Sequence, residues 1–298
     1  MLNGDFSVQH SGLNGAITQV SALTERALPN SELEVHRHYH EFEVYYFLEG
    51  DLFFSFEGRH IKVQEGCMII ISNSMLHRPI IKNECRYFRK RILFNKDIFI
   101  KMGYELYNRL KKRKILVLGK KTVEEVGIDK LFCSVETCVS AGSSYDDFCA
   151  LVSLLSLLIK AEQHGEQLDD YISFESSEKV SEIITYIDEH LTEDLSYKIL
   201  SEVFYLSEKY LYKIFKNETG FTLSDYIKER RIIMAQSILN AGGSAKTAAY
   251  SSGFKDYSAF YRCFSKKVGI TPTEYIRRET TIGKSATARR DVAKRARR

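Results

Sequence analysis

A short plan repeated in the last third of the chain constrains its fold most strongly. Residues 200–220 and 248–269 each read as a short helix, a tight turn and a second helix of mixed basic, polar and aromatic residues, followed by a Gly. The copies start about 48 residues apart, and the repetition of the whole plan argues against a chance origin. Two helices joined by a tight turn are the unit that lays its second helix in the DNA major groove. The repeat predicts two DNA-binding hairpins.

The first copy has a clear division between buried and outward positions. Leu200 and Val203 give its first helix an apolar face, and Leu211, Ile214 and Phe215 give its second helix another. Ser207 is a good N-cap for that second helix. The residues expected to contact DNA are Ser207, Lys209, Tyr210, Tyr212, Lys213 and Lys216.

In the second copy, Gly253 breaks the chain between the helices, Asp256 caps the second helix, and Phe260 and Phe264 form its buried side. Arginine reads a guanine edge through two parallel hydrogen bonds, whereas Lys, Ser and Tyr more often hold phosphates. Arg262 is therefore the base-reading candidate. The expected DNA contacts of this copy are Tyr257, Ser258, Tyr261, Arg262 and Lys266.

Between the copies, residues 223–240 contain no Pro or Gly and predict one long amphipathic helix. Such a helix would hold the two hairpins rigidly, so that their second helices enter successive major grooves about 34 Å apart. The chain carries a net charge of only +4. Residues 206–278, however, hold 13 Lys and Arg against 6 Asp and Glu. Local positive charge of this kind attracts phosphates.

Residues 177–278 resemble the AraC/XylS-type DNA-binding domain, an all-α domain with two helix-turn-helix motifs. The resemblance implies promoter DNA and RNA polymerase as partners, and it suggests activation of transcription. The matching residues are Ser207, Leu211, Phe215, Lys216, Glu218, Thr219, Gly220, Tyr226, Arg230, Ala235, Leu239, Ala249, Gly253, Phe254, Phe260, Phe264, Gly269, Thr271, Pro272 and Tyr275.

Two departures from that pattern predict unequal hairpins. The first turn carries Phe204 and Tyr205, and a bulky Tyr is a poor choice for a positive φ angle. In the second hairpin, Ala245 and Ala248 replace larger aliphatic residues. The smaller buried area lowers the stability of this hairpin by about 1 kcal/mol or more per site. We expect the first hairpin to contribute more DNA affinity than the second.

Earlier in the chain, residues 17–94 read as short β-rich runs. Gly50, Gly58 and Gly66 separate them at eight-residue intervals, which predicts tight hairpins in a barrel or sandwich. Pro29 and Pro79 are expected at the margins of these runs. We predict an α+β protein of two domains, with this barrel in the N-terminal one.

Three histidines and a carboxylate in this region resemble the first and second cupin motifs: His36, His38 and Glu43, then His77. Such a set suits a divalent transition metal, but the second motif lacks its usual Pro-x-Gly before the histidine. Regulators of the AraC type commonly hold a small effector in these barrels without metal, so we expect no cofactor. The expected effector site comprises His36, His38, His40, Glu43, Tyr45, His77 and Arg91.

After residue 96 the apolar residues recur with the period of an α-helix. One apolar stripe on a predicted helix consists of Leu151, Leu154, Leu155 and Leu158. By resemblance these helices mediate dimerisation, whereas a stripe buried within one chain is the alternative. The predicted boundaries are a cupin-like barrel at 1–115, a helical dimerisation segment at 116–168, a polar linker at 169–179, the DNA-binding domain at 180–280 and a basic disordered tail at 281–298. That tail is either a phosphate-binding arm or a solubilising extension.

Composition limits the setting of the protein. The six Cys show no CxxC spacing, so buried reduced thiols are expected. No secretory signal begins the chain, and the apolar run at 148–161 is too short to span a bilayer. We expect a cytoplasmic protein without membrane partners.

The leading hypothesis is a sequence-specific transcription regulator, not an enzyme, that pairs as a homodimer. An effector of unknown identity, with sugars a common class in such regulators, would bind the barrel and favour one domain arrangement. One alternative is a metal-dependent cupin enzyme with an appended DNA-binding module. Another is an architectural DNA binder that relies on the basic tail.

Overall fold

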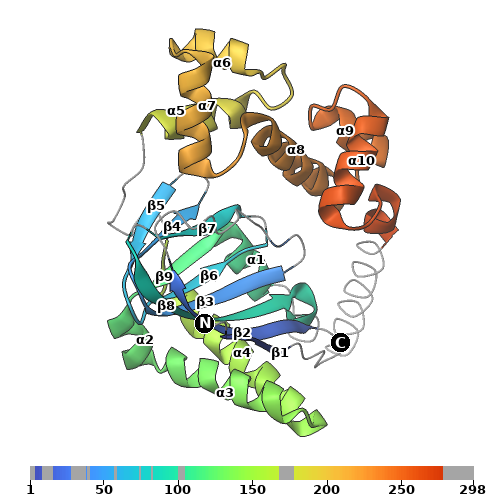
Figure 1. Cartoon of the computed structure of the whole chain (residues 1–298). Coiled ribbons are helices and arrows are strands. Elements are labelled where there is room, and N and C mark those ends of the chain that lie inside the picture. Colours follow the sequence, from blue (N-terminus) through green and yellow to red (C-terminus); the bar gives the residue numbers. More distant parts are fainter. Residues whose placement is uncertain are drawn as a thin grey trace. The chain divides into compact units, whose positions relative to one another are not determined.

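A computed structural model describes residues 4–8, 16–27, 38, 41–56, 59–73, 75–81, 83–99, 105–167 and 178–277. The chain divides into two compact units, Met1–Glu175 and Ser176–Arg298, and each is described by itself (Figure 1). The predictions for His36, His40, Pro29, Gly58, most of the linker and the basic tail lie outside the described residues.

The first unit is built on two antiparallel sheets. The larger sheet has the order β1 (Gly4–Val8), β2 (Ile17–Ala27), β8 (Cys85–Asn95), β3 (Glu41–Glu49), β6 (Met68–Ile71), β9 (Ile115–Leu118) and β10 (Glu166–Gln167). The smaller sheet has the order β5 (Arg59–Val63), β4 (Leu52–Phe56) and β7 (His77–Ile81). The barrel thus reaches beyond the predicted boundary at residue 115, because β9 pairs with β6.

Alternation along β3 separates two cores. Phe42 and Val44 pack in a cluster with side chains of the helices, including Phe132. Tyr45 and Phe47 face the opposite way and pack in a second cluster that includes Phe54 of the smaller sheet. Because successive strand residues point to opposite faces, the larger sheet lies between a helical layer and the smaller sheet.

The helical layer follows the strands. It comprises the 3₁₀ helix η2 (Lys96–Phe99), α1 (Glu105–Arg113), α2 (Lys120–Val126), α3 (Ile128–Ala141) and α4 (Ser144–His164). Ser143 caps α4 in a reciprocal box with Asp146. Leu154, Leu155 and Leu158 are buried in the unit's own core, so this stripe serves the intramolecular packing that the sequence left as the alternative. No helix in the described part of the chain is long and apolar enough to cross a membrane.

Two expectations for this unit were wrong. Pro79 lies within β7 and not at a margin. Strand β7 is at the edge of the smaller sheet, which is where a strand tolerates Pro. Cys133 and Cys149 are exposed, whereas Cys67 is buried as expected. The helical period of α3 and α4 turns the two exposed thiols away from the Leu-rich core.

In the described part of the second unit, all regular elements are helices. It contains α5 (Glu178–Glu189), α6 (Tyr197–Phe204), α7 (Glu208–Thr219), α8 (Leu223–Asn240), α9 (Ala245–Ser251) and α10 (Tyr257–Val268), then helical residues 272–277. The hairpins α6–α7 and α9–α10 and the connecting helix α8 follow the prediction. Each starts at a capping side chain, which satisfies a backbone N–H of the first turn: Ser196, Ser207, Thr222, Ser244 and Asp256.

Candidate DNA-binding surface and barrel site

Helix α7 separates its buried and exposed sides as its sequence predicts. Ser207 Oγ accepts a hydrogen bond from Tyr210 N–H at 3.3 Å, and Leu211 and Phe215 are fully buried. Lys216 Nζ donates to Tyr212 Oη at 3.3 Å. The structure leaves every predicted contact of this hairpin exposed, and these are Ser207, Lys209, Tyr210, Tyr212, Lys213 and Lys216.

The turn between α6 and α7 has the strain that the sequence suggests. Tyr205 caps the end of α6 in the left-handed region, at φ 53° and ψ 42°, where a side chain with a Cβ costs about 1–2 kcal/mol. Its ring is 94% exposed, so no packing opposes this conformation. Leu200 is buried, but Val203 is 39% exposed. Val203 therefore does not supply the core face expected of it.

Helix α10 is anchored by aromatic packing. Asp256 Oδ1 accepts from Ala259 N–H at 2.7 Å, and the buried rings of Phe260 and Phe264 lie 5.4 Å apart. Tyr257 is half-buried, since its ring packs beside Phe260. The other predicted contacts of this hairpin are exposed: Ser258, Tyr261, Arg262 and Lys266.

Several basic residues near the hairpins have internal partners. Arg230 of α8 donates to both carboxylate oxygens of Asp188 on α5, at 2.7 and 2.6 Å. Lys267 of α10 pairs with the buried Glu229 of α8. Charge counting along the sequence assigned these cations to phosphate attraction, because composition carries no information about such partners. The structure uses them to tie α5 and α10 to α8.

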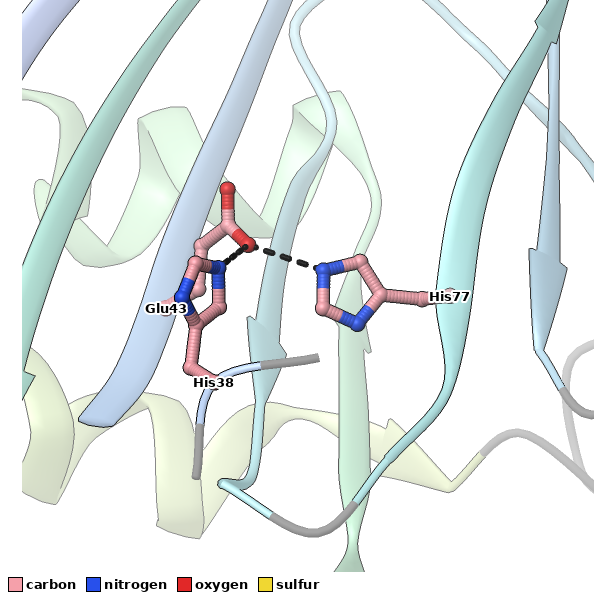
Figure 2. A group of neighbouring side chains, drawn as sticks. All are labelled: His38, Glu43 and His77. Atoms are coloured by element: carbon pink, nitrogen blue, oxygen red, sulfur yellow. Dashed lines mark hydrogen bonds and ion pairs between the residues drawn. The ribbon is translucent and has the colours of Figure 1, made fainter. Parts of the chain in front are cut away.

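In the first unit, the structure brings together three of the predicted site residues. His38, Glu43 and His77 place their ligand atoms within 4.8 Å of one another (Figure 2). Glu43 Oε2 lies 3.0 Å from His77 Nε2 and 3.2 Å from His38 Nε2. Glu43 and His77 are buried and His38 is half-buried.

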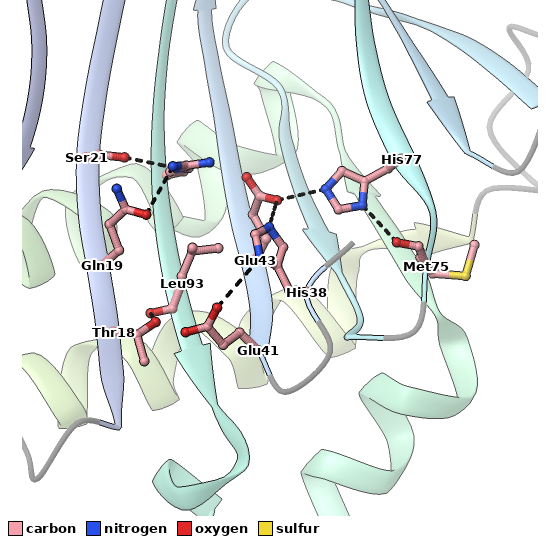
Figure 3. Close-up of polar contacts among 10 residues, drawn as sticks. Thr18, Gln19, Ser21, His38, Glu41, Glu43, Met75, His77 and Leu93 are labelled. Carbon is pink, nitrogen blue, oxygen red and sulfur yellow. Dashed lines mark hydrogen bonds and ion pairs between the residues drawn. The ribbon is translucent and has the colours of Figure 1, made fainter. Parts of the chain in front are cut away.

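The polar contacts of this cluster hold Glu43 ionised. Burial by itself would raise the pKa of Glu43, but hydrogen bonds and charge interactions with His38 and His77 outweigh it and keep that pKa well below its usual value. His77 Nδ1 donates to the Met75 carbonyl at 3.0 Å (Figure 3). Its Nε2 faces the Glu43 carboxyl group, so a proton or a cation must lie between the two groups.

The same three residues fit a divalent metal ion. They offer two imidazole nitrogens and a carboxylate oxygen within 4.8 Å of one another, which is a ligand set that suits a divalent transition metal. The Nδ1 bond of His77 to a carbonyl is also the outer contact that orients metal-binding histidines. A bound ion would supply Lewis acidity here.

Two further predicted site residues, Tyr45 and Arg91, lie opposite each other on neighbouring strands of the larger sheet, on its inner face. Tyr45 Oη bonds to Tyr87 Oη, and burial followed by the charge of Tyr87 raises the pKa of Tyr45 well above its usual value. Arg91 donates to Ser21 Oγ at 3.1 Å and to Gln19 Oε1 at 3.0 Å; both acceptors are visible in Figure 3. The prediction missed Tyr87, Ser21 and Gln19, although period-2 alternation along their strands would have placed them on this face.

The fold and these sites define a class of protein in which a β-barrel with a polar inner face precedes a DNA-binding unit of two helical hairpins. Residues 200–278 match the family described as a helix-turn-helix domain, and residues 24–88 match the cupin domain family. The Bacillus subtilis HTH-type transcriptional regulator YobQ is 24% identical over 244 residues, which is 80% of this chain and 88% of YobQ. Regulatory protein SoxS of Escherichia coli is 28% identical over 97 residues, or 32% of this chain and 91% of SoxS. The chain therefore combines a helix-turn-helix domain of the AraC type with a cupin domain, as its resemblance to AraC-family regulators predicts.

Coverage differs among the relatives. LumQ of Photobacterium leiognathi, described as a probable transcriptional regulator, is 32% identical over 31% of this chain and 38% of LumQ. The chain thus spans little more than a third of that protein. Among solved structures, ToxT of Vibrio cholerae is similar over 86% of this chain and 96% of ToxT, at 13% identity and a TM-score of 0.36.

Proposed function

We propose that this regulator binds promoter DNA sequence-specifically through α7 and α10, and that it activates transcription together with RNA polymerase in the cytoplasm. The observation that carries the proposal is the pair of capped helices whose basic, exposed faces stand opposite fully buried aromatic faces. SoxS, 91% of which is aligned with this chain, is itself a regulatory protein. Selection of binding sites from a random DNA pool, followed by transcription in vitro from a selected promoter, tests both parts.

We infer that a small polar molecule bound to the inner face of the barrel controls this activity. His38, Glu43, His77, Tyr45 and Arg91 give that face both hydrogen-bond donors and a carboxylate. An effector acts by binding one arrangement of the chain more tightly than another. A thermal-shift screen of sugars and other polar metabolites on the full chain tests this, because a true effector raises the melting temperature by mass action.

The second copy of the chain is the proposed partner of α4. Tyr145, Phe148, Val152 and Ile159 are exposed on that helix although all four are large and apolar. Their spacing of three, four and seven residues places them on one face, opposite the buried Leu stripe, and a seven-residue repeat of this kind forms a self-complementary seam. Sedimentation equilibrium should give a dimer for the wild-type chain and a monomer for Phe148→Glu. Cys149 lies beside this seam and is exposed, which makes disulfide cross-linking an independent measurement.

The His38, Glu43 and His77 cluster is the observation that favours the alternative, a metal-dependent enzyme. Elemental analysis of the purified chain separates the two functions when it is combined with His38→Ala. A regulator without a resident metal keeps its effector response in the presence of a chelator. An enzyme would lose both its metal and its turnover in the variant.

A further inference from the structure

The turn of the second hairpin packs against a loop that belongs to the first half of the DNA-binding unit. Gly253 has φ +91° and stands next to the loop at residues 190–195, which connects α5 to α6. A Cβ at Gly253 would fall within contact distance of the Leu191 carbonyl oxygen and 3.0 Å from Thr192 Cα. The two backbones approach so closely that a side chain has no room between them.

Arg231 of α8 joins the two segments at this point. Its Nε donates to the Leu191 carbonyl at 2.9 Å and its Nη2 donates to the Glu193 carbonyl at 2.8 Å. The same Nε lies 2.8 Å from the position of a Cβ at Gly253. The guanidinium is half-buried, and that burial lowers its pKa against the opposing charge of Asp194. A planar fork of donors suits two carbonyls held by one loop.

The position of this contact gives it mechanical importance. Arg230 and Asp188 tie α5 to α8, and Lys267 and Glu229 tie α10 to α8. Those contacts hold each half to the connecting helix but not the halves to each other. The loop at 190–195 and Gly253 come from opposite halves, and Arg231 of α8 contacts the loop directly beside Gly253. Arg231 therefore links the two halves to each other as well as to α8.

We infer that Arg231, the loop at 190–195 and Gly253 form a brace that fixes the spacing between α7 and α10, so that the protein accepts two DNA half-sites at one separation. This rests on the proposed binding of DNA by both hairpins. Arg231 acts as a positioning residue, since its donors are engaged by backbone carbonyls. Each added base pair moves a half-site by about 3.4 Å and rotates it by about 35° around the DNA axis. A rigid pair of helices cannot follow that displacement.

The test measures spacing preference in the full chain. Fluorescence anisotropy gives the affinity of the wild type, Arg231→Lys and Arg231→Ala for a selected two-half-site operator and for operators with one or two base pairs added or removed. Arg231→Lys is the matched variant, because it keeps the charge but loses the fork. Lys255→Ala controls for charge, since Lys255 contacts Asp194 on the same loop through a pair that is exposed on both sides.

The wild type and Lys255→Ala should lose about tenfold or more in affinity on a shifted operator, as expected when one helix no longer reaches its bases. Both Arg231 variants should lose less than about threefold on the same operator, while the affinity of each for a single half-site stays near that of the wild type. Circular dichroism confirms that the variants are folded. Arg231 variants that are folded and discriminate spacing as strongly as the wild type overturn the brace.

A second measurement separates the brace from the proposed function. Spin labels at Lys213→Cys on α7 and Ser258→Cys on α10, in a background with the native cysteines replaced by Ser, report the distance between the two helices without DNA. The brace predicts a narrow distribution in the otherwise wild-type chain and a broader one with Arg231→Lys. Equal widths overturn it. If the wild type binds no DNA, the proposed function fails and these widths still decide the brace.

Discussion

The two hairpins share one backbone plan but solve its turn differently. The first places Tyr205 in the left-handed region with its ring in solvent, whereas the second places Gly253 there and packs it against the loop at 190–195. A turn that faces solvent can hold a residue other than Gly in the left-handed region at a cost of about 1–2 kcal/mol in strain. A turn that packs on another backbone requires Gly for a second reason, which is space. The turn of the first hairpin is therefore free-standing, in the sense that it faces solvent, whereas the turn of the second is anchored to the loop at 190–195.

The largest expected effect comes from adding a single methyl group at the anchored turn. Gly253→Ala meets both a positive φ angle and the Leu191 carbonyl, so we expect a loss of about 3 kcal/mol in the free energy of unfolding of the DNA-binding unit. Gly269→Ala is the control, because Gly269 has φ +79° but no atom near its Cβ position; it should lose about 1 kcal/mol. Chemical denaturation followed by circular dichroism measures both. Equal losses would mean that the close approach contributes nothing.

The next largest effect is on DNA affinity, and it differs in kind between the two hairpins. Arg262→Ala should weaken binding by about 1–3 kcal/mol and relax the preference at one base pair. Lys213→Ala should weaken binding to all sequences alike and reduce the salt dependence by about one phosphate contact. Affinities for a set of single-base operator variants at several salt concentrations distinguish the two patterns. A uniform loss for Arg262→Ala would reassign that residue to phosphate contact.

The sequence predicted the helices of the DNA-binding unit but not the contacts between them. Helix limits such as those of α8 follow from local signals, namely the period of apolar residues and the capping side chains, so they were predictable. The separate roles of Arg230 and Arg231 were not, because their partners lie about 40 residues away and any exposed helix could carry the same charges. In the barrel, the motif resemblance foresaw that Glu43 meets His77. Tyr87 was missed because it was not assigned to a strand face.

The N-cap of α10 should stabilise its helix more than the N-cap of α7 does, although the difference is smaller than that between the two turns. Asp256 Oδ1 accepts from the backbone at 2.7 Å, whereas Ser207 Oγ accepts at 3.3 Å. A charged, shorter hydrogen bond at a helix N-terminus is the stronger one. We expect Asp256→Ala to lower the free energy of unfolding by about 1.5 kcal/mol and Ser207→Ala by about 0.5–1 kcal/mol. Asp256→Asn keeps the acceptor without the charge, so it should lose less than Asp256→Ala in the same denaturation experiment.

The smallest effect is a gain at the free-standing turn. Tyr205→Gly removes the Cβ that opposes φ 53° but adds freedom to the unfolded chain, so the net stabilisation should be about 0.5–1 kcal/mol. Tyr205→Ala keeps the Cβ and should leave stability nearly unchanged, since the ring is exposed and packs on nothing that would be lost. Thermal unfolding of the three chains decides between them. If Tyr205→Ala stabilises as much as Tyr205→Gly, the ring and not the backbone angle is the source of strain, and the difference between the two turns lies only in their packing.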